Sequence, residues 1–274
     1  MIAKPRPRLS AYLTDQMASG RIVFTRDQAL RELGLGRRAF LDSAERLQRK
    51  GQLASPRQGF YVIVPPQFSS WGGPPPSWYI DDLMRYEGRP YYVALLKAAE
   101  LHGIAHQAVM AFQVITDKRL PDIRLGRSRI SFHFRKSMQD VSASILTRKT
   151  DTGTLSLSSP ELTALDLVRY PRAAGGIDNI ATVLMGLSAA VDAEKLASLS
   201  SAFERAAIQR LGFLLGYLGY ENLAGPLRNA ICGQKLTWVE LDSQEIKSMD
   251  FAPATVERNK HWRVTVRRFP EIDD

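Results

Sequence analysis

A proline-rich stretch limits what this chain can fold into more than any other feature of its sequence. The segment "PPQFSSWGGPPPSW" holds five prolines and two glycines in fourteen residues. Proline fixes its own φ and lacks a backbone donor, so this segment is excluded from helices and central strands. We therefore expect a semi-rigid linker at residues 65–77, between a first domain at 1–64 and a second domain at 78–274.

The positive charge of the chain is concentrated in the first of these domains. Residues 1–64 contain 12 Lys and Arg against 5 Asp and Glu, a net charge of +7. The rest of the chain contains 25 against 23, a net charge of +2. A basic domain of this kind is typical of nucleic-acid-binding modules, although many ordinary solvated faces are also basic.

The residue pattern of the first domain predicts a winged helix-turn-helix. An apolar stripe over 9–17 predicts a first helix, and Thr25 with Gln28 three residues later predicts the capped start of a second helix. Gly34 and Gly36 separate that helix from a third one, which is the spacing of a helix-turn-helix. Residues 51–65 follow as two strands around a turn at 55–59, and such a hairpin is a wing.

The third helix is the candidate recognition helix. Phe40, Ala44 and Leu47 share one face, which we expect to pack on the first two helices. The opposite face carries a row of residues four apart that we expect to read bases: Arg38, Asp42 and Arg46, with Arg37 near its edge. Arg49, Lys50 and the wing-tip residue Arg57 are expected to hold phosphates. The full candidate DNA-binding set is Arg37, Arg38, Asp42, Ser43, Arg46, Arg49, Lys50, Arg57 and Gln58.

An ordinary surface helix is the alternative for this third helix. Arg–Asp and Arg–Glu pairs four residues apart are common on exposed helices and need no ligand. The predicted wing and the concentrated charge favour a DNA-binding function instead. We therefore expect double-stranded DNA to be the partner of the first domain.

The second domain is expected to mix helices and strands, which makes the fold class α+β. We expect Ser77 to cap the first of two helices that are separated near residues 88–90, followed by a buried strand at 111–116. Ser159 and Pro160 predict the start of a helix that ends by Pro171. Residues 174–220 are expected to be largely helical, and β-like segments at 235–241 and 261–269 close the chain.

A second basic segment spans residues 118–136, with seven Lys and Arg against one Asp. Within it, apolar residues at 130, 132 and 134 alternate with Arg129, Ser131, His133 and Arg135, which predicts a strand with one basic face. The candidate polyanion site here consists of Arg124, Arg127, Arg129, Arg135 and Lys136. A solvated edge strand that is protected from aggregation by its charges is the alternative.

Residues suited to catalysis or metal binding are few. His102 and His106 are four apart, but "HGIAH" lacks the glutamate of a zinc protease motif. Asp166 has no second carboxylate near it in the sequence, so we expect a capping or network role for it. Cys232 is the only cysteine and is expected to be a small core residue. We therefore expect no catalytic residue, metal or cofactor.

The sequence also bears on the compartment. It contains no run of eighteen apolar residues, and no apolar segment follows the basic residues at its N-terminus as in a secretory signal. A single cysteine excludes an internal disulfide framework. We expect a cytoplasmic protein with no membrane partner.

Three stretches give the chain a resemblance to a known family. They are "YYVALLKAAELHGIAHQAVMAFQVIT", "SPELTALDLVRYPRAAGGIDNIATVL" and the terminal "WRVTV". Together with the predicted winged helix and the linker, they resemble the AbiEi antitoxins of type IV toxin–antitoxin (abortive infection) systems over essentially the whole chain. The resemblance implies a winged helix that binds operator inverted repeats and represses its own operon. It also implies a C-terminal antitoxin domain that counteracts a nucleotidyltransferase-like toxin without forming a stable complex with it, and it supplies no catalytic motif.

Two other functions stay open at this point. One is a one-component transcriptional regulator whose second domain binds a small ligand. The other is a metal-dependent nucleic-acid-processing enzyme that uses the basic strand and Asp166.

Overall fold

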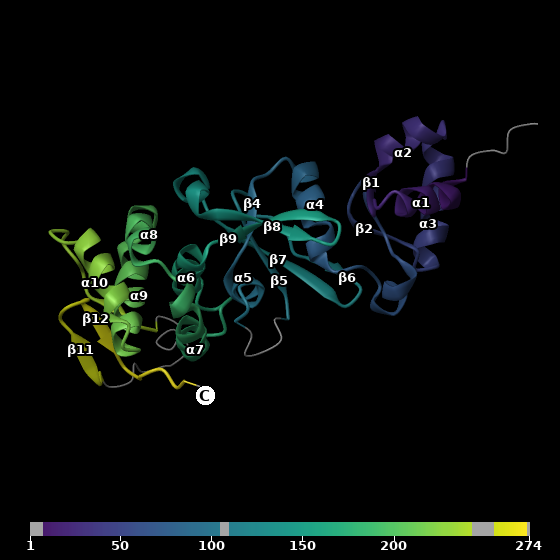
Figure 1. Cartoon of the computed structure of the whole chain (residues 1–274). Coiled ribbons are helices and arrows are strands. Elements are labelled where there is room, and N and C mark those ends of the chain that lie inside the picture. The colour runs from purple at the N-terminus through teal and green to yellow at the C-terminus, as the bar shows by residue number, and fades with distance from the viewer. Residues whose placement is uncertain (1–7, 105–109, 243–254, 273–274) are drawn as a thin grey trace, which may run out of the picture. The chain divides into compact units, whose positions relative to one another are not determined.

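The structure is a computed structural model that describes residues 8–104, 110–242 and 255–272 (Figure 1). These residues form two compact units. The first unit holds the described residues up to 91 together with 110–136 and 147–156, and the second unit holds the other described residues. Helices and mixed sheets make up the chain, which confirms the predicted α+β class. The predicted boundaries at 64 and 78 lie inside the first unit and stay a prediction.

The N-terminal part of the first unit contains three helices and a small sheet, drawn in purple and blue in Figure 1. The helices are α1 (Leu9–Ala18), α2 (Arg26–Leu33) and α3 (Arg37–Arg49). The strands β1 (Val23–Thr25), β2 (Leu53–Arg57) and β3 (Phe60–Ile63) form an antiparallel sheet in the order β1-β3-β2. Every helix and strand predicted for this part of the sequence is present, including the hairpin of β2 and β3.

An aromatic cluster holds these elements together. Phe24 of β1 stacks on Tyr61 of β3 with ring centroids 5.4 Å apart, and Tyr12 of α1 meets Phe24 edge to face. Phe40 of α3 packs edge to face on Tyr61 and is completely buried. Each such pair adds about 0.5–1.5 kcal/mol beyond the burial of its surface. Burial, with a smaller contribution from Glu32, raises the pKa of Tyr12 to about 12.

The proline-rich segment is structured and packed. It forms two short 3-10 helices, η1 (Pro66–Trp71) and η2 (Pro76–Trp78), and no strand or α-helix, as its composition requires. Gly72 lies so close to Gly126 that a Cβ on Gly72 would approach the Gly126 Cα to 2.7 Å. The segment between β3 and α4 is therefore fixed against a turn that lies more than fifty residues later in the sequence.

A six-stranded mixed sheet follows, in the order β6-β7-β5-β4-β9-β8. Its strands are β4 (Tyr91–Val93), β5 (Phe112–Thr116), β6 (Ile123–Leu125), β7 (Ser128–Phe134), β8 (Ile145–Thr150) and β9 (Gly153–Ser158), and η3 (Gln139–Ser144) precedes β8. The edge-strand alternative is wrong for the basic strand, because β7 lies between β6 and β5. β8 and β9 were not predicted.

The two helices expected between 77 and 110 are present as α4 (Ile80–Glu87) and α5 (Leu95–Leu101). Strand β4 lies between them and was not predicted. Ser77 does not cap α4, because Ser77 is part of η2 and Tyr79 is the N-cap residue of α4. The predicted strand at 111–116 is confirmed as β5.

The remaining helices lie in the second unit. Ser159 caps α6 (Pro160–Arg169) by accepting a hydrogen bond from the Leu162 amide at 3.3 Å, as predicted. The other elements are α7 (Ile177–Leu187), η4 (Ser188–Ala190), α8 (Ala193–Ser198), η5 (Leu199–Ala202), α9 (Arg205–Tyr217) and α10 (Glu221–Ala230), and a sheet in the order β10-β12-β11 with β10 (Val239–Glu240), β11 (Glu257–Asn259) and β12 (Val264–Val266). The largely helical stretch and both terminal β-like segments are confirmed.

A glycine of α9 explains how the small terminal sheet attaches to the helices. A Cβ on Gly212 would fall 2.2 Å from the ring of Trp262, so the indole packs directly on the helix backbone. Beside it, the Gln209 side chain donates to the carbonyl groups of Thr237 and Trp262, both at 2.8 Å. None of the helices that the structure describes has the length and apolar character needed to cross a membrane.

Candidate nucleic-acid interface

The turn between α2 and α3 sets the direction of α3. The Thr25 hydroxyl accepts from the Gln28 amide at 3.2 Å and caps the start of α2, as the sequence predicted. Gly34 ends the helix in the left-handed region, with φ of 60°. Two residues later Gly36 is the N-cap of α3, so a turn of three residues, 34–36, joins the two helices.

One face of α3 is anchored in the core. Phe40, Ala44 and Leu47 are buried in a cluster with residues of α1, β1 and β3. Removing this much apolar surface from water stabilises the position of α3 by several kcal/mol, at about 25 cal/mol per Å². The helix is therefore held rigidly, with its opposite face directed outwards.

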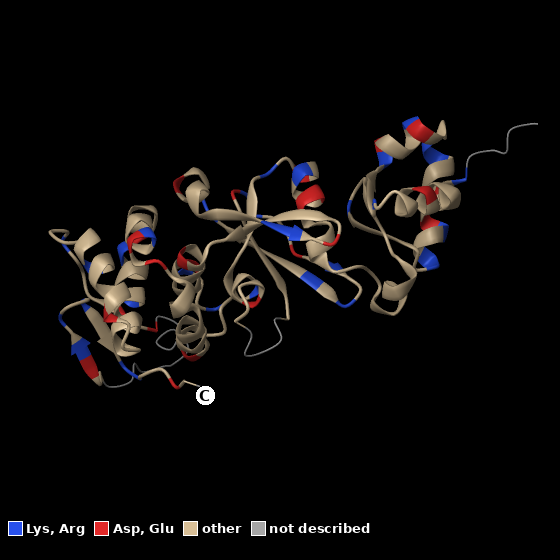
Figure 2. Ribbon diagram, viewed as in Figure 1, with Lys and Arg blue, Asp and Glu red and all other residues tan. Residues whose placement is uncertain are grey.

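Along α3, four arginines alternate with the acidic residues Asp42 and Glu45, which Figure 2 colours blue and red. The predicted DNA-binding residues of this helix are all exposed except Ser43, which is partly buried: Arg37, Arg38, Asp42, Arg46, Arg49 and Lys50. Arg49 is paired with Glu45, and Arg46 donates to the Asp42 carbonyl and to the Ser43 hydroxyl, both at 3.2 Å. Within the described parts of the chain, the guanidinium and ammonium groups of Arg37, Arg38, Arg46 and Lys50 form no ion pair. The structure brings this set together on one surface.

A groove runs between the start of α1 and the basic face of α3. It encloses about 530 Å³ and is lined by Arg8 and Ser10 of the α1 end and by Ser43, Arg46 and Lys50 of α3. Arg8 and Ser10 were not among the predicted site residues. Arg8 is the N-cap residue of α1, and its place beside α3 depends on how the helices pack, which the sequence alone does not give.

The predicted wing tip, Arg57 and Gln58, does not line this groove and contacts other residues of the first unit. Arg57 Nε is 2.8 Å from Glu87 Oε1, and its Nη2 donates to the Pro121 carbonyl at 2.6 Å. The Gln58 carbonyl accepts a hydrogen bond from the Tyr86 hydroxyl at 2.8 Å, while the residue itself is exposed. Arg57 and Gln58 are thus next to α4, and their role in DNA binding stays a prediction.

The second basic segment divides into exposed and buried charges. Arg124, Arg127 and Lys136 are exposed, and Arg129 is exposed but bonded to Asp122 at 2.7 Å. Arg135 is only 2% exposed, so it does not lie on the predicted basic face. The alternation ends because β7 stops at Phe134, which is exposed, and the Arg135 amide donates to the Thr116 carbonyl. Burial lowers the pKa of His133, and Asp122 partly opposes this effect.

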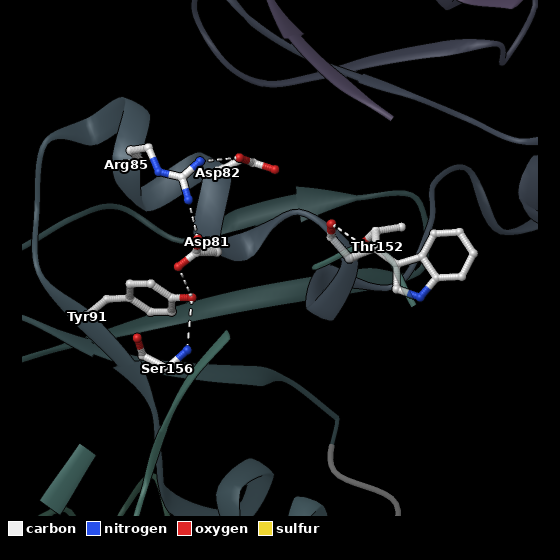
Figure 3. A network of polar contacts seen from close by, with 7 residues as sticks. Asp81, Asp82, Arg85, Tyr91, Thr152 and Ser156 are labelled. Carbon is white, nitrogen blue, oxygen red and sulfur yellow. Dashed lines mark hydrogen bonds and ion pairs between the residues drawn. The ribbon is translucent and has the colours of Figure 1, made fainter. Parts of the chain in front are cut away.

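A polar network joins α4 to Tyr91 of β4 and Ser156 of β9, and all of its residues belong to the first unit (Figure 3). Arg85 donates to Asp81 and Asp82 at 2.5 and 2.6 Å. Tyr91 donates to the other oxygen of Asp81 at 3.1 Å and accepts from the Ser156 amide at 3.3 Å. Burial raises the pKa of Tyr91, so its hydroxyl stays protonated. Two carboxylates hold the charge of Arg85, which is therefore a structural residue.

A cavity of about 380 Å³ lies beside this network. Strand β1 forms one wall, and η2, α4 and the β8–β9 turn form the others. The side chains that give it chemical character are Arg21, Gln28, Trp78, Asp82 and Tyr86. The lining of this cavity therefore combines polar and aromatic side chains.

The residues considered for catalysis have structural roles. Asp166 is fully buried and accepts a hydrogen bond from the Tyr92 hydroxyl at 2.9 Å, which confirms the network role expected for it. His102 Nε2 lies 2.7 Å from the Ser158 carbonyl oxygen, and His106 lies outside the described residues. Cys232 is exposed, so its assignment to the core is wrong: it lies in a turn directly after Ile231, the buried C-cap residue of α10. In the chain segments that the structure describes, no cluster of His, Cys, Asp and Glu is suited to a metal ion.

Comparisons with known proteins bear on the second part of the chain. Residues 92–217 match the model of the AbiEi antitoxin C-terminal domain. The resemblance to the AbiEi family is confirmed. This match supports an antitoxin role, and the matched family is not an enzyme family. The match includes the Tyr92–Asp166 hydrogen bond and excludes α3, so it says nothing about the basic face.

The whole chain also has a counterpart among solved structures. The crystal structure of the RV2827C protein from Mycobacterium tuberculosis has a TM-score of 0.68 to this structure and 19% sequence identity. The similarity covers 95% of this chain and 92% of that chain, and at this identity it shows a shared fold alone. The comparison with curated proteins found no match.

Proposed function

We propose that this protein is the antitoxin of a type IV toxin–antitoxin system and that it represses its own operon. In this proposal residues 8–64 are a winged helix-turn-helix that binds operator inverted repeats, and the C-terminal domain counteracts a nucleotidyltransferase-like toxin. The exposed basic face on the firmly anchored helix α3 carries the DNA-binding half. The AbiEi match at residues 92–217 supports the antitoxin half. A repressor of this kind acts where the DNA is, in the cytoplasm.

The contacts of α3 suit it for the major groove. Arg38, Asp42 and Arg46 lie in one row, and an arginine can bond guanine through two hydrogen bonds. Arg46 is held only by neutral groups of its own helix, so it can exchange those bonds for a base at little cost. Arg37 lies at the start of the helix, where base edges are reached, while Arg49 and Lys50 at its end hold phosphates.

The direct test is binding to the repeats upstream of the gene. We expect Arg38→Ala with Arg46→Ala to weaken operator binding by about 1–3 kcal/mol per lost bidentate contact and to reduce discrimination against unrelated DNA. Lys235→Ala with Lys260→Ala removes the same charge from exposed positions of the second unit and is the matched control. Fluorescence anisotropy with both DNAs measures the effect. Equal selectivity of the two double variants would rule out α3 as the reading helix.

The antitoxin half has a separate test. Co-expression with the toxin candidate encoded next to this gene should restore growth, and the Arg38→Ala, Arg46→Ala variant should restore it as well, because residues 92–217 are unchanged. We expect no stable complex of the two proteins in size-exclusion chromatography. Loss of growth rescue in the α3 variant, at equal protein level, would contradict a separate antitoxin domain.

A ligand-responsive regulator is the second candidate function, and the cavity between β1 and α4 favours it. A small polar, aromatic molecule bound there would contact both the DNA-binding part and the rest of the first unit. Operator affinity that changes with a metabolite, and a response lost in Trp78→Ala, would support this function. Operator affinity that is constant across a metabolite panel would leave the antitoxin as the sole candidate.

A further inference from the structure

We propose that the hairpin of β6 and β7 takes the place of the predicted wing tip in DNA binding. Arg124 and Arg127 of this hairpin bind phosphates of the duplex beside the site of α3, whereas Arg57 does not contact DNA. This inference rests on the proposed DNA-binding function of α3 and names a second part of the same interface. All of its residues belong to the first unit.

Arg57 is already occupied by the fold. Its guanidinium bonds Glu87 and the Pro121 carbonyl, and it lies over the ring of Phe132 at 5.6 Å. The side chains of Arg57 and Glu87 are only 18% and 20% exposed. A phosphate contact would have to break an ion pair that is largely shielded from water and would leave the carboxylate of Glu87 unpaired, which is costly.

The turn of the β2–β3 hairpin is also covered in part. A Cβ on Gly59 would fall 2.7 Å from the Tyr86 hydroxyl, and the rings of Phe60 and Tyr86 are 5.4 Å apart. The Tyr86 hydroxyl donates to the Gln58 carbonyl at the tip itself. Tyr86 of α4 therefore covers the Gly59 side of this turn, while the Gln58 side chain stays exposed.

The β6–β7 hairpin lies next to this covered wing and is fixed there. Strand β6 lies against β2, and a Cβ on Gly126 in the hairpin turn would fall 1.9 Å from the Trp71 carbonyl oxygen. Arg127 donates its amide to the same carbonyl at 2.9 Å, and a Cβ on Gly73 would fall 1.8 Å from a Leu125 methyl group. The hairpin is thus attached to the proline-rich segment that follows β3, and it can act as an extension of the winged helix.

The hairpin presents two available cations. Arg124 and Arg127 are exposed, and in the described part of the chain no carboxylate pairs with either side chain. Arg129, which lies opposite Arg124 in the register, is instead bonded to Asp122 through two of its nitrogens. Preventing aggregation is the alternative role for charged groups on an edge strand such as β6. The position of the pair beside the wing favours phosphate contact over that role.

The salt dependence of DNA binding tests this inference. Each phosphate contact contributes roughly −0.9 to the slope of log K against log salt concentration. Arg124→Gln with Arg127→Gln should therefore make the slope shallower by about 1.8 and weaken binding equally to operator and unrelated duplex DNA. Lys235→Gln with Lys260→Gln should keep the wild-type slope. Arg57→Gln should also keep the slope, while its thermal melting temperature falls because the internal ion pair is lost.

The possible outcomes distinguish a failure of the hairpin inference from a failure of the proposed DNA-binding function. If the hairpin variant keeps the slope of the lysine control while Arg38→Ala with Arg46→Ala loses selectivity, the hairpin inference is wrong and α3 alone binds DNA. If Arg57→Gln makes the slope shallower by about 0.9 at an unchanged melting temperature, the predicted wing tip contacts DNA and the inference is also wrong. If wild-type protein binds no duplex DNA, the proposed repressor function fails with it. Backbone footprinting adds a direct measurement, since the hairpin variant should lose protection outside the bases covered by α3.

Discussion

The two arginine-rich segments of this chain, α3 and residues 118–136, differ in what happens to their charges on folding. In α3 the predicted cations stay on one exposed face, and only Arg49 is paired with a carboxylate. In the second segment Arg135 is buried, Arg129 is bonded to Asp122, and Arg119 lies 5.3 Å over the ring of Phe134. Arg124 and Arg127 remain available at the hairpin turn.

A count of charges in a sequence therefore overestimates the charge that is available to bind a polyanion. A helix with a period of 3.6 residues separates its apolar and basic faces over its whole length, so the face of each arginine is settled by local geometry. A strand has the same property only while it lasts, and β7 ends one residue before Arg135. Aspartates and aromatic rings from neighbouring segments then decide which charges are used inside the protein.

The largest effect that we expect concerns the anchoring of α3. Phe40→Ala removes a fully buried ring from the centre of the aromatic cluster and should lower the free energy of unfolding by about 3–5 kcal/mol. Leu41→Ala is the matched control, since Leu41 is the next residue and is 41% exposed. Urea unfolding followed by circular dichroism measures both. Equal midpoints for the two variants would show that the basic face does not depend on this packing.

The second effect distinguishes two neighbouring basic residues of the second segment. Arg135→Ala empties a fully buried position and should lower the free energy of unfolding by about 2–4 kcal/mol through lost packing and lost polar contacts. Lys136→Ala, one residue further along the chain, changes an exposed side chain and should stay within about 0.5 kcal/mol of wild type. The same denaturation experiment compares them. A smaller effect at 135 than at 136 would contradict the buried position of Arg135.

The sequence predicts those parts of this structure that depend on signals within a few residues. The helices α1, α2 and α3, their turn and the β2–β3 hairpin are predictable, because caps, glycines and apolar periodicity act within a few residues. The cap of α6 at Ser159 is predictable for the same reason. Strand β4 was missed because three buried residues after a proline carry no alternation. Strand β8 was missed because its residues are exposed or only partly buried, and β9 because its exposed and buried residues do not alternate regularly.

Long-range contacts are what the sequence does not give. No signal near Arg57 indicates that Glu87, thirty residues later, will bond it, or that Pro121 will accept from it. The burial of Arg135 and the exposure of Cys232 depend in the same way on where an element ends and what covers it. The candidate DNA-binding surface was therefore predictable on α3 but not at the wing, where distant segments decide.

A smaller effect is expected from the acidic residue within the basic face of α3. Asp42 accepts from a cytosine amino group if it reads a base, and it repels phosphates if it does not. Asp42→Asn should therefore lower the ratio of operator to unrelated-DNA affinity by about tenfold or less, with part of the change coming from tighter binding to unrelated DNA. Glu45→Gln frees Arg49 from its ion pair and should strengthen binding to both DNAs alike. An equal shift for both DNAs in Asp42→Asn would exclude base reading at this position.

The smallest effect that we expect is a change of protein stability with pH that arises from His133 of the second segment. Burial lowers the pKa of His133 in the folded protein, so folding favours the neutral imidazole. The stabilisation is complete above the unfolded pKa of about 6.5 and is lost as the pH falls through the lower folded value. His133→Gln should remove this part of the decrease in urea midpoint between pH 7.5 and 5.5, whereas the exposed His261→Gln should keep it. Residues 37–50 contain no histidine, so the charge of the α3 face is constant over this range. If His133→Gln loses stability with falling pH as steeply as wild type, His133 is not the group that titrates. The partly buried His133 of β7 would then not distinguish this segment from α3 in its response to protons.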